Sequence, residues 1–355
     1  MSITAPIRDR VARIAELVAT PLVPADYLDL ISPLRAGAAL RGRVVAVHPE
    51  TRDAVTLVIR PGRGWRAPTP GQYIRVAVDV DGVRYWRAYS LTSPQRTDGC
   101  VSITVKAIPD GKVSNHLVRR ARPGMLLEMD QAAGDFVLPA APPAKVLFVT
   151  AGSGVTPVMG MLRNHRDALA DVVVVHSAPT SDDVIFGGEL RRLAAAGRIR
   201  LIEQHTDADG MLAAADLDTL VADLAEREVW ACGPTGLLTA IEDHLDSIGR
   251  ADHLHTERFR ADVVVTGEGG AVTFTKSGTT VAADGGTALL DAGEAAGVLM
   301  PSGCRMGICF GCVVPLREGA VRDLRNGELT TAAEGDGVLI QTCVSAAAGA
   351  CHIDL

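Results

Sequence analysis

No apolar run in this chain approaches the roughly 18 residues needed to cross a membrane. The N-terminus, MSITAPIRDRVARIAELVA, is charged and amphipathic, and it lacks the apolar core and small-residue cleavage site of a secretory signal. Internal repeats and low-complexity tracts are also missing. These absences predict a soluble, cytoplasmic protein that does not itself span a membrane.

The sequence also lacks the clustered Lys and Arg residues with interleaved aromatics that are typical of a nucleic-acid-binding surface. The net charge of −7 is uneven: residues 1–144 carry +6, residues 145–261 carry −7 and residues 262–355 carry −6. A basic first segment and an acidic last segment could attract each other or steer a protein partner, although ordinary solvated surfaces would give the same counts. We therefore expect no nucleic-acid partner.

With 355 residues the chain is long for one domain, and its hydrophobic content of 47% predicts well-buried cores. We expect an N-terminal extension over 1–38, a β-rich domain over 39–143, a domain of alternating strands and helices over 144–260, and a third domain over 261–355. An apolar stripe at helical spacing in the extension predicts a helix packed on the body of the protein.

The β-rich segment contains short runs separated by Gly and Pro turns, which is typical of an antiparallel barrel. Its expected strands lie at 43–47, 54–60, 73–80, 83–90 and 101–108. The next segment alternates strands with helices, which predicts a doubly wound parallel sheet. Its expected strands lie at 145–150, 171–176, 198–203 and 228–231, and its expected helices at 155–169, 183–195, 215–224 and 235–248. A connection over 255–262 then leads to two strands at 263–266 and 271–276 and a helix near 287–296.

Four of the seven cysteines indicate a metal centre. Cys304, Cys309 and Cys312 have the spacing C-x4-C-x2-C, and Cys343 follows from a distant strand. This is the plant-type [2Fe–2S] spacing, whereas four-cysteine zinc sites usually come as two separated pairs. A zinc site and a disulfide framework are the alternatives, and cluster ligands suit a reducing compartment.

Two segments of the β-rich domain have the chemistry of a flavin site. In Arg87-Ala88-Tyr89-Ser90 the Tyr face can lie on a ring, Ser can hydrogen-bond a ring nitrogen and Arg can meet a phosphate. In the stretch 111–117 a glycine and a serine at a helix start offer N–H groups to a phosphate. The alternatives are an exposed edge-strand end for the first segment and a simple turn with an N-cap for the second.

Two segments of the expected strand–helix domain over 144–260 suit a nucleotide. The stretch 150–157, TAGSGVTP, joins a hydrophobic strand to a helix, where glycines permit close approach of a pyrophosphate. It is not a full G-x-G-x-x-G, because Pro157 occupies the last position. Cys232-Gly233-Pro234 ends a later strand, at the sheet edge where such folds place ligands, although a buried structural cysteine is the alternative.

In order and spacing, these motifs resemble the ferredoxin–NADP⁺ reductase superfamily, followed by a plant-type ferredoxin. The resemblance implies an antiparallel flavin-binding β-barrel, a doubly wound α/β nucleotide-binding domain and an α+β β-grasp domain, with FAD, NADPH or NADH and a [2Fe–2S] cluster as cofactors. For FAD it implies contacts from Arg87, Ala88, Tyr89, Ser90, Val105, Lys106, Gly111, Val113, Ser114 and Phe259. For the nucleotide it implies contacts from Gly152, Ser153, Gly154, Thr156, Pro157, Ser177, Cys232, Gly233 and Pro234.

The resemblance also implies a relay from nicotinamide to flavin to cluster to a protein acceptor. Ser90 is expected near flavin N5, Cys232 near the nicotinamide and Glu257 beside the flavin, as the three catalytic residues. A plain linker is the alternative for Glu257 and Phe259.

The segment 20–28 is similar to actinobacterial reductases that serve membrane-bound acyl-CoA desaturases, so a stearoyl-type desaturase is the expected acceptor. The reductase component of an aromatic-ring or alkane oxygenase is the alternative, and a flavin/iron–sulfur redox sensor is a third reading. The desaturase resemblance favours NADPH over NADH. However, the stretch 177–180 after the second strand of the nucleotide domain has neither an Arg nor an acidic residue, and Arg191 and Arg192 come later on a helix.

Overall fold

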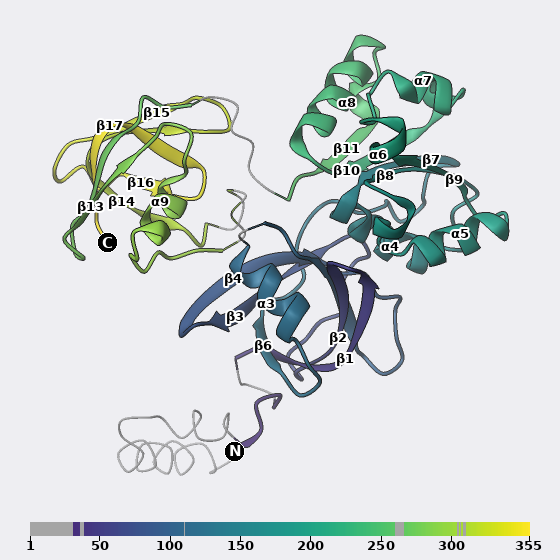
Figure 1. Cartoon of the computed structure of the whole chain (residues 1–355), viewed down its shortest axis with the longest axis horizontal. Helices are drawn as coiled ribbons and strands as arrows, with labels where there is room; N and C mark the ends of the chain where they lie inside the picture. The colour runs from purple at the N-terminus through teal and green to yellow at the C-terminus, as the bar shows by residue number, and fades with distance from the viewer. Residues whose placement is uncertain are drawn as a thin grey trace, which may run out of the picture.

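Three β-sheets follow one another along the chain in the computed structural model (Figure 1). The structure describes residues 31–35, 39–109, 111–259, 266–303, 305, 307 and 310–355. The N-terminal stripe and residues 263–265 of one expected strand lie outside the described residues. Within the described part of the chain, no helix is long and apolar enough to cross a membrane.

The first sheet is antiparallel and curls into the predicted barrel. Its strands are β1 (Arg41–Thr51), β2 (Ala54–Pro61), β3 (Tyr73–Val80), β4 (Val83–Ser90), β5 (Val101–Lys106) and β6 (Leu126–Met129), in the order β4-β3-β6-β1-β2-β5. The two ends of this order meet, because Leu91 forms an antiparallel bridge with Ile103 of β5 and the Thr92 N–H donates to the Ser102 carbonyl at 2.8 Å. Helix α3 (Lys112–Arg120) begins after Gly111, where the sequence predicts a helix start.

The second sheet is parallel, as the alternating pattern predicts. Its strands are β7 (Lys145–Ala151), β8 (Asp171–Ala178), β9 (Arg200–His205), β10 (Glu228–Cys232) and β11 (Leu254–Glu257), in the order β11-β10-β7-β8-β9. Helices α4 (Val155–Asn164) and α5 (Gly187–Ala195) cover one face, and α7 (Asp216–Leu220) and α8 (Thr235–Ser247) cover the other. Phe148 of β7 packs on the α4 side and Leu147 on the α8 side, since successive side chains alternate across a strand.

The expectation of a plain connection over 255–262 is wrong for its first residues, because Leu254–Glu257 form β11 beside β10. This strand is short and carries His255 and Glu257, so no apolar pattern marks it in the sequence. Backbone pairing at the sheet edge stabilises it instead. Three helices are also clearly shorter than expected. Helix α4 ends at Asn164, α5 starts at Gly187 after a 3₁₀ turn over Ser181–Asp183, and α7 covers only Asp216–Leu220.

The third sheet is mixed and carries one helix, the predicted β-grasp arrangement. Its elements are β12 (Gly270–Phe274), β13 (Thr279–Ala283), α9 (Leu289–Ala295), β14 (Val313–Asp323), β15 (Leu329–Ala332), β16 (Leu339–Gln341) and β17 (Ser345–Ile353). The order is β13-β12-β17-β14-β15, with β16 beside β14, and β12 and β17 are parallel. Leu289 and Leu290 of α9 pack with Phe274 in the core of this sheet.

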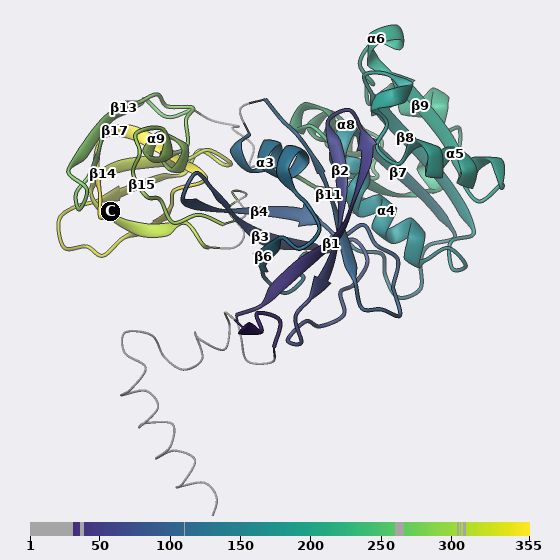
Figure 2. The ribbon, with the colours of Figure 1, turned by 60° about the horizontal axis from the view of Figure 1, so that its bottom comes forward.

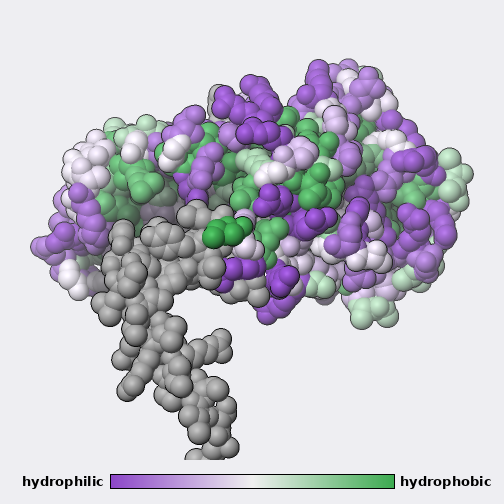
Figure 3. All heavy atoms as spheres, turned by 90° about the horizontal axis from the view of Figure 1, so that it is seen from below, coloured by the Kyte–Doolittle hydropathy of each residue, from purple (hydrophilic) through white to green (hydrophobic). Residues whose placement is uncertain are grey.

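The barrel lies between the other two sheets in both ribbon views (Figures 1 and 2). It packs directly on the parallel sheet, because Phe136 and Leu138 share a buried cluster with Val155 and Met159 of α4. The Trp230 indole N–H of β10 donates to the Val137 carbonyl at 3.3 Å. Hydrophilic side chains are spread over the lower face of the molecule, with hydrophobic ones between them (Figure 3). The domain boundaries stay predictions, and residue 260 lies outside the described residues.

Candidate active site

The last residue of β4 is a buried serine. Ser90 is 3% exposed, lies opposite Tyr73 of β3 and has no hydrogen-bond partner for its Oγ among the described residues. A buried hydroxyl without a partner is costly, so this atom marks a place where a bound polar ring would fit. Burial raises the pKa of the neighbouring Tyr89, which keeps its phenol neutral.

Basic side chains lie beside this strand end. Desolvation lowers the pKa of Arg87, and among the described residues no carboxylate lies within ion-pair distance of its guanidinium. Arg87 lies 5.9 Å from the centroid of the Tyr85 ring, and the Lys112 ammonium lies 5.5 Å from the same centroid. Two cations around one ring suit a flavin phosphate. Lys112 was not predicted, although a basic residue just after a Gly at a helix start is a recognisable signal.

The other expected flavin residues of the barrel have structural partners. The Ser114 hydroxyl donates to the Gly111 carbonyl at 3.2 Å and accepts from the Ile108 N–H at 3.3 Å, so it also stabilises its own turn. Lys106 pairs with Asp53 at 2.7 Å. Val105 and Val113 are buried in the barrel core. Flavin contacts from these residues stay predictions, and so does the contact from Ala88.

The glycine turn after β7 is held against the end of β10. Gly152 has a φ of +54° and open space around its missing Cβ, so a ligand can approach this backbone closely. A Cβ on Gly154 would lie 1.9 Å from the Cys232 carbonyl oxygen, so the two expected nucleotide loops touch through backbone. The Thr156 hydroxyl donates to the Ser153 carbonyl at 2.9 Å at the start of α4.

Several expected nucleotide residues share one sheet edge. These residues end a strand or begin the following helix: Ser177 at the end of β8, Gly233 and Pro234 before α8, and Pro157 in the first turn of α4. The carboxyl ends of parallel strands meet at one edge, which is where doubly wound folds bind ligands. The sequence-predicted set is therefore brought together there.

Cys232 and Glu257 end neighbouring strands in register at this edge. Burial raises the pKa of the Cys232 thiol well above its usual value, and burial raises the pKa of Glu257 to about 8. The Glu257 Oε2 has no hydrogen-bond partner among the described residues. At neutral pH a protonated carboxyl and a neutral thiol thus lie side by side, and the carboxyl can donate to a bound group. Phe259, two residues on, is 38% exposed.

Two of the four expected cluster ligands lie within the described residues. The Cys312 and Cys343 sulfurs are 3.2 Å apart, well beyond the roughly 2.05 Å of a disulfide, and both residues are buried. Thr342 joins their segments, since its N–H and its hydroxyl both donate to the Cys312 carbonyl, at 3.2 and 3.0 Å. Convergent buried thiols fit an iron–sulfur cluster. Cys304 and Cys309 lie outside the described residues.

Cys343 does not lie where the sequence predicts it, and Arg305 of the cysteine-bearing segment makes ion pairs. Cys343 lies in the turn between β16 and β17 and not on a strand, and this turn places its sulfur 3.2 Å from that of Cys312. Arg305, between the first two expected ligands, forms an ion pair with Asp291 at 2.6 Å and another with Glu294. After desolvation, Arg305 is the largest cause that lowers the pKa of Arg87, so these two guanidinium groups lie near each other.

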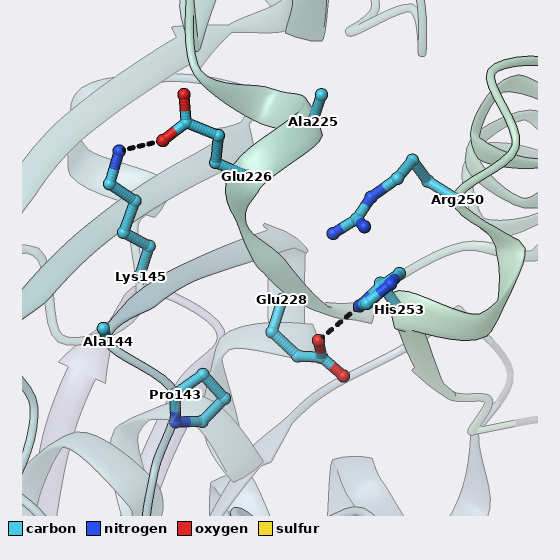
Figure 4. Close-up of a pocket in the computed structure, with 8 residues that line it drawn as sticks. All are labelled: Pro143, Ala144, Lys145, Ala225, Glu226, Glu228, Arg250 and His253. Carbon is cyan, nitrogen blue, oxygen red and sulfur yellow. Dashed lines mark hydrogen bonds and ion pairs between the residues drawn. The ribbon is translucent and has the colours of Figure 1, made fainter.

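A pocket of about 410 Å³ lies away from these residues (Figure 4). Lys145 and Glu228, which line it, begin β7 and β10, so the pocket is at the amino ends of the strands. Inside it the His253 Nδ1 and the Glu228 carboxylate are 2.8 Å apart, and the Arg250 guanidinium points into the space (Figure 4). Its position excludes it as the nucleotide site expected at the carboxyl edge.

Three family models match the chain in succession. An oxidoreductase FAD-binding domain matches residues 67–138, an oxidoreductase NAD-binding domain matches residues 148–243 and a 2Fe-2S iron-sulfur cluster binding domain matches residues 272–348. These matches confirm the predicted FAD, nucleotide and [2Fe–2S] cofactors.

Curated relatives match most of the length of the chain. An NADPH oxidoreductase of Mycobacterium tuberculosis is 48% identical over 97% of this chain and 91% of the relative. A glycine betaine monooxygenase reductase subunit of Chromohalobacter salexigens is 33% identical over 77% of this chain and 84% of the relative. A 3-ketosteroid-9-alpha-monooxygenase ferredoxin reductase component of Mycolicibacterium smegmatis is 32% identical, over 84% and 92% respectively.

The fold is that of a solved three-part reductase. The structure of phthalate dioxygenase reductase matches with a TM-score of 0.63 and 22% identity, over 89% of this chain and 97% of that one. The order of barrel, parallel sheet and cysteine-bearing sheet is therefore the same in both. The chain belongs to the ferredoxin reductase superfamily, in the group of NAD(P)H-dependent flavin oxidoreductases with a C-terminal [2Fe–2S] domain.

Proposed function

We propose that this reductase supplies electrons from NADPH to a membrane-bound acyl-CoA desaturase of the stearoyl type. The observation that carries the proposal is the match to the mycobacterial NADPH oxidoreductase over 97% of the chain. The match leaves only about 3% of the chain uncovered, so it includes most of the 1–38 extension, where segment 20–28 resembles reductases that serve acyl-CoA desaturases. The relatives named as monooxygenase reductases match only 77–84% of the chain.

When bound, FAD and the cluster would supply hydride acceptance from the nicotinamide and one-electron transfer, which is chemistry of the cofactors. The chain's own residues position the groups. The Ser90 hydroxyl would hold the flavin ring, and Arg87 with Lys112 would neutralise a flavin phosphate. At the sheet edge Cys232 would contact the nicotinamide, and the protonated Glu257 would donate a hydrogen bond to a group bound there.

The preference for NADPH is supported by an arginine that comes from a helix. Arg191 of α5 reaches the loop after β8, where its Nη2 donates to the Ser181 hydroxyl at 2.8 Å. Its Nε and Nη2 also donate to the Glu203 carboxylate, at 3.0 and 2.8 Å, which orients the guanidinium. An arginine beside the second strand's carboxyl end is the side chain that accommodates a 2′-phosphate. The sequence pattern placed no arginine there, because Arg191 follows ten residues later.

The NADPH preference has a matched test. Arg191→Gln is expected to lower kcat/KM for NADPH by about 10- to 100-fold, the worth of a charge-assisted hydrogen bond, and to leave NADH unchanged. Arg192→Gln is the control, because the Arg192 Nε donates to the Gly188 carbonyl of its own helix. Equal effects of the two variants, or a loss shared by NADH, would remove Arg191 from this role.

A soluble oxygenase component is the second candidate acceptor, and the names of the monooxygenase reductase relatives favour it. The purified protein with FAD and cluster would be supplied with NADPH and, separately, with membranes that carry a stearoyl-type desaturase or with a purified ring-hydroxylating oxygenase. Formation of the unsaturated acyl-CoA supports the proposal, and hydroxylation alone supports the alternative. NADPH oxidation that reaches no protein acceptor would favour a redox sensor.

A further inference from the structure

The last turn of α4 is bonded to the segment that directly follows the expected flavin strand. Leu91, Thr92 and Ser93 come immediately after Ser90, and each of their carbonyl groups meets a residue of α4. Elsewhere the two domains meet in the buried cluster of Phe136 and Leu138 with α4, in the Trp230–Val137 hydrogen bond and in an ion pair of Arg52 with Asp183 at 3.2 Å. The connection between β6 and β7 is the proline-rich stretch 139–144. The buried apolar cluster restrains relative motion of the two domains, and the polar contacts of α4 also fix the direction of their approach.

Arg163 is the central residue of this contact. Its Nη1 donates to the Thr92 carbonyl, while its Nε and Nη2 donate to the two Glu189 oxygens at 3.0 and 2.5 Å. Its guanidinium carbon lies 4.6 Å from the centroid of the Phe186 ring. Phe186 has a left-handed φ of +61°, a costly conformation for an aromatic residue. The guanidinium is thus fixed from two sides and aimed at the barrel.

Two neighbours of Arg163 extend the contact. Asn164 donates to the Ser93 carbonyl at 3.0 Å and accepts from the Gln95 N–H at 2.6 Å. Gly160 lies so close to the barrel that a Cβ there would be 2.4 Å from the Leu91 carbonyl oxygen. Because real Cβ contacts essentially never fall below 3.0 Å, only glycine permits this approach, which fixes the separation of the two domains on the α4 side.

We infer that Gly160, Arg163 and Asn164 form an interdomain staple that sets the distance between the flavin half and the nicotinamide half of the site. Ser90 precedes the stapled segment directly, and α4 begins at the glycine turn that faces Cys232. A shift at the staple is therefore carried to the hydride-transfer geometry through one strand end and one helix. Arg163 is a positioning residue in this account, which rests on the proposed hydride transfer between NADPH and flavin.

The test adds one methyl group at the interdomain contact and compares it with a matched control. In Gly160→Ala the new Cβ requires a shift of at least 0.6 Å, from 2.4 to 3.0 Å. Gly188→Ala in α5 adds the same methyl where nothing lies within 4 Å. Since a misplacement of 1 Å can cost 10²-fold, kcat for NADPH-driven ferricyanide reduction should fall about 10-fold in Gly160→Ala and not in Gly188→Ala.

A second pair of variants removes the cation. Arg163→Met is expected to reduce kcat similarly. Arg166 is exposed and lies just beyond the end of α4, so Arg166→Met should leave kcat unchanged. Arg163→Lys should restore part of the rate, because lysine can still donate to the Thr92 carbonyl. Flavin content and the Kd for NADP⁺, measured by fluorescence, should stay unchanged in these variants. A variant that is merely less well folded would not combine these unchanged values with a loss of kcat in Arg163→Met and its partial recovery in Arg163→Lys.

The isotope effect separates geometry from stability. With NADPH deuterated at the transferred position, the primary effect on kcat should rise in Gly160→Ala and Arg163→Met, because hydride transfer becomes slower than later steps. Unchanged kcat and isotope effect in both variants would overturn the staple. A fall in kcat that is fully explained by lost flavin or by a lower Tm would also overturn it. If the unaltered protein fails to oxidise NADPH, it is the proposed function that fails.

Discussion

Alanine at Gly154 tests whether the two nucleotide loops must touch. The backbone of Gly154 has an ordinary helical φ of −61°, so alanine adds no conformational strain there. The added Cβ would stand 1.9 Å from the Cys232 carbonyl oxygen and 2.9 Å from the Gly233 nitrogen. Because contacts of this kind do not fall below 3.0 Å, the loops must separate by at least 1.1 Å.

That displacement should have two measurable consequences. Overpacking at a buried junction costs about 1–3 kcal/mol of unfolding free energy, and a shift of about 1 Å between reacting groups lowers the rate about 10²-fold. Stopped-flow measurement of flavin reduction by NADPH and urea unfolding would report the two effects. Gly236→Ala in α8, where nothing lies within 4 Å, is the control. Near-equal rates in the two variants would refute the close approach of the loops.

Three further predictions concern single side chains. Folding raises the pKa of Glu257 from 4.5 to about 8, so between these pH values the folded state binds one more proton than the unfolded state. The free energy of unfolding should therefore fall as pH rises from about 4.5 to 8. If Glu257→Gln shows the same dependence of unfolding free energy on pH, this prediction is wrong. Arg227, 5% exposed and bonded to Asp171 and Asp223, should cost about 1–3 kcal/mol in urea unfolding when changed to Met, and a neutral result would show that its ion pairs add nothing. Ser90→Ala should lower the rate of flavin reduction at least about 10-fold with the fold intact, and wild-type kinetics would remove Ser90 from the site.

Much of the fold followed from local pattern. Alternating apolar residues located the barrel strands, and the shift to strand–helix alternation located the parallel sheet. The strand Leu254–Glu257 was missed because its stability comes from pairing with β10, which its own residues do not signal. Helix ends were misplaced for a related reason, since the 3₁₀ turn over Ser181–Asp183 has acidic residues that also suit a helix start.

The site was predictable where glycines or cysteines impose a spacing. The turn at Gly152–Gly154 and its partner at Cys232 depend on backbone approach, which the sequence displays as glycine. Arg163 and Arg191 were not predictable as contributors, because each acts through a partner that is distant in sequence or on another element. Which loop a helical side chain reaches depends on how the helix packs against the rest of the fold, and the local sequence does not encode that packing.

The central claim is that electrons from NADPH reach a [2Fe–2S] cluster held by Cys312 and Cys343 together with Cys304 and Cys309. Its most direct test is anaerobic titration of the purified protein with NADPH, followed by flavin absorbance and by electron paramagnetic resonance of the cluster. The account predicts flavin bleaching and a reduced-cluster signal in the unaltered protein, and bleaching without that signal in Cys343→Ser. A protein that binds no iron, or a cluster that stays oxidised while the flavin is reduced, would contradict it.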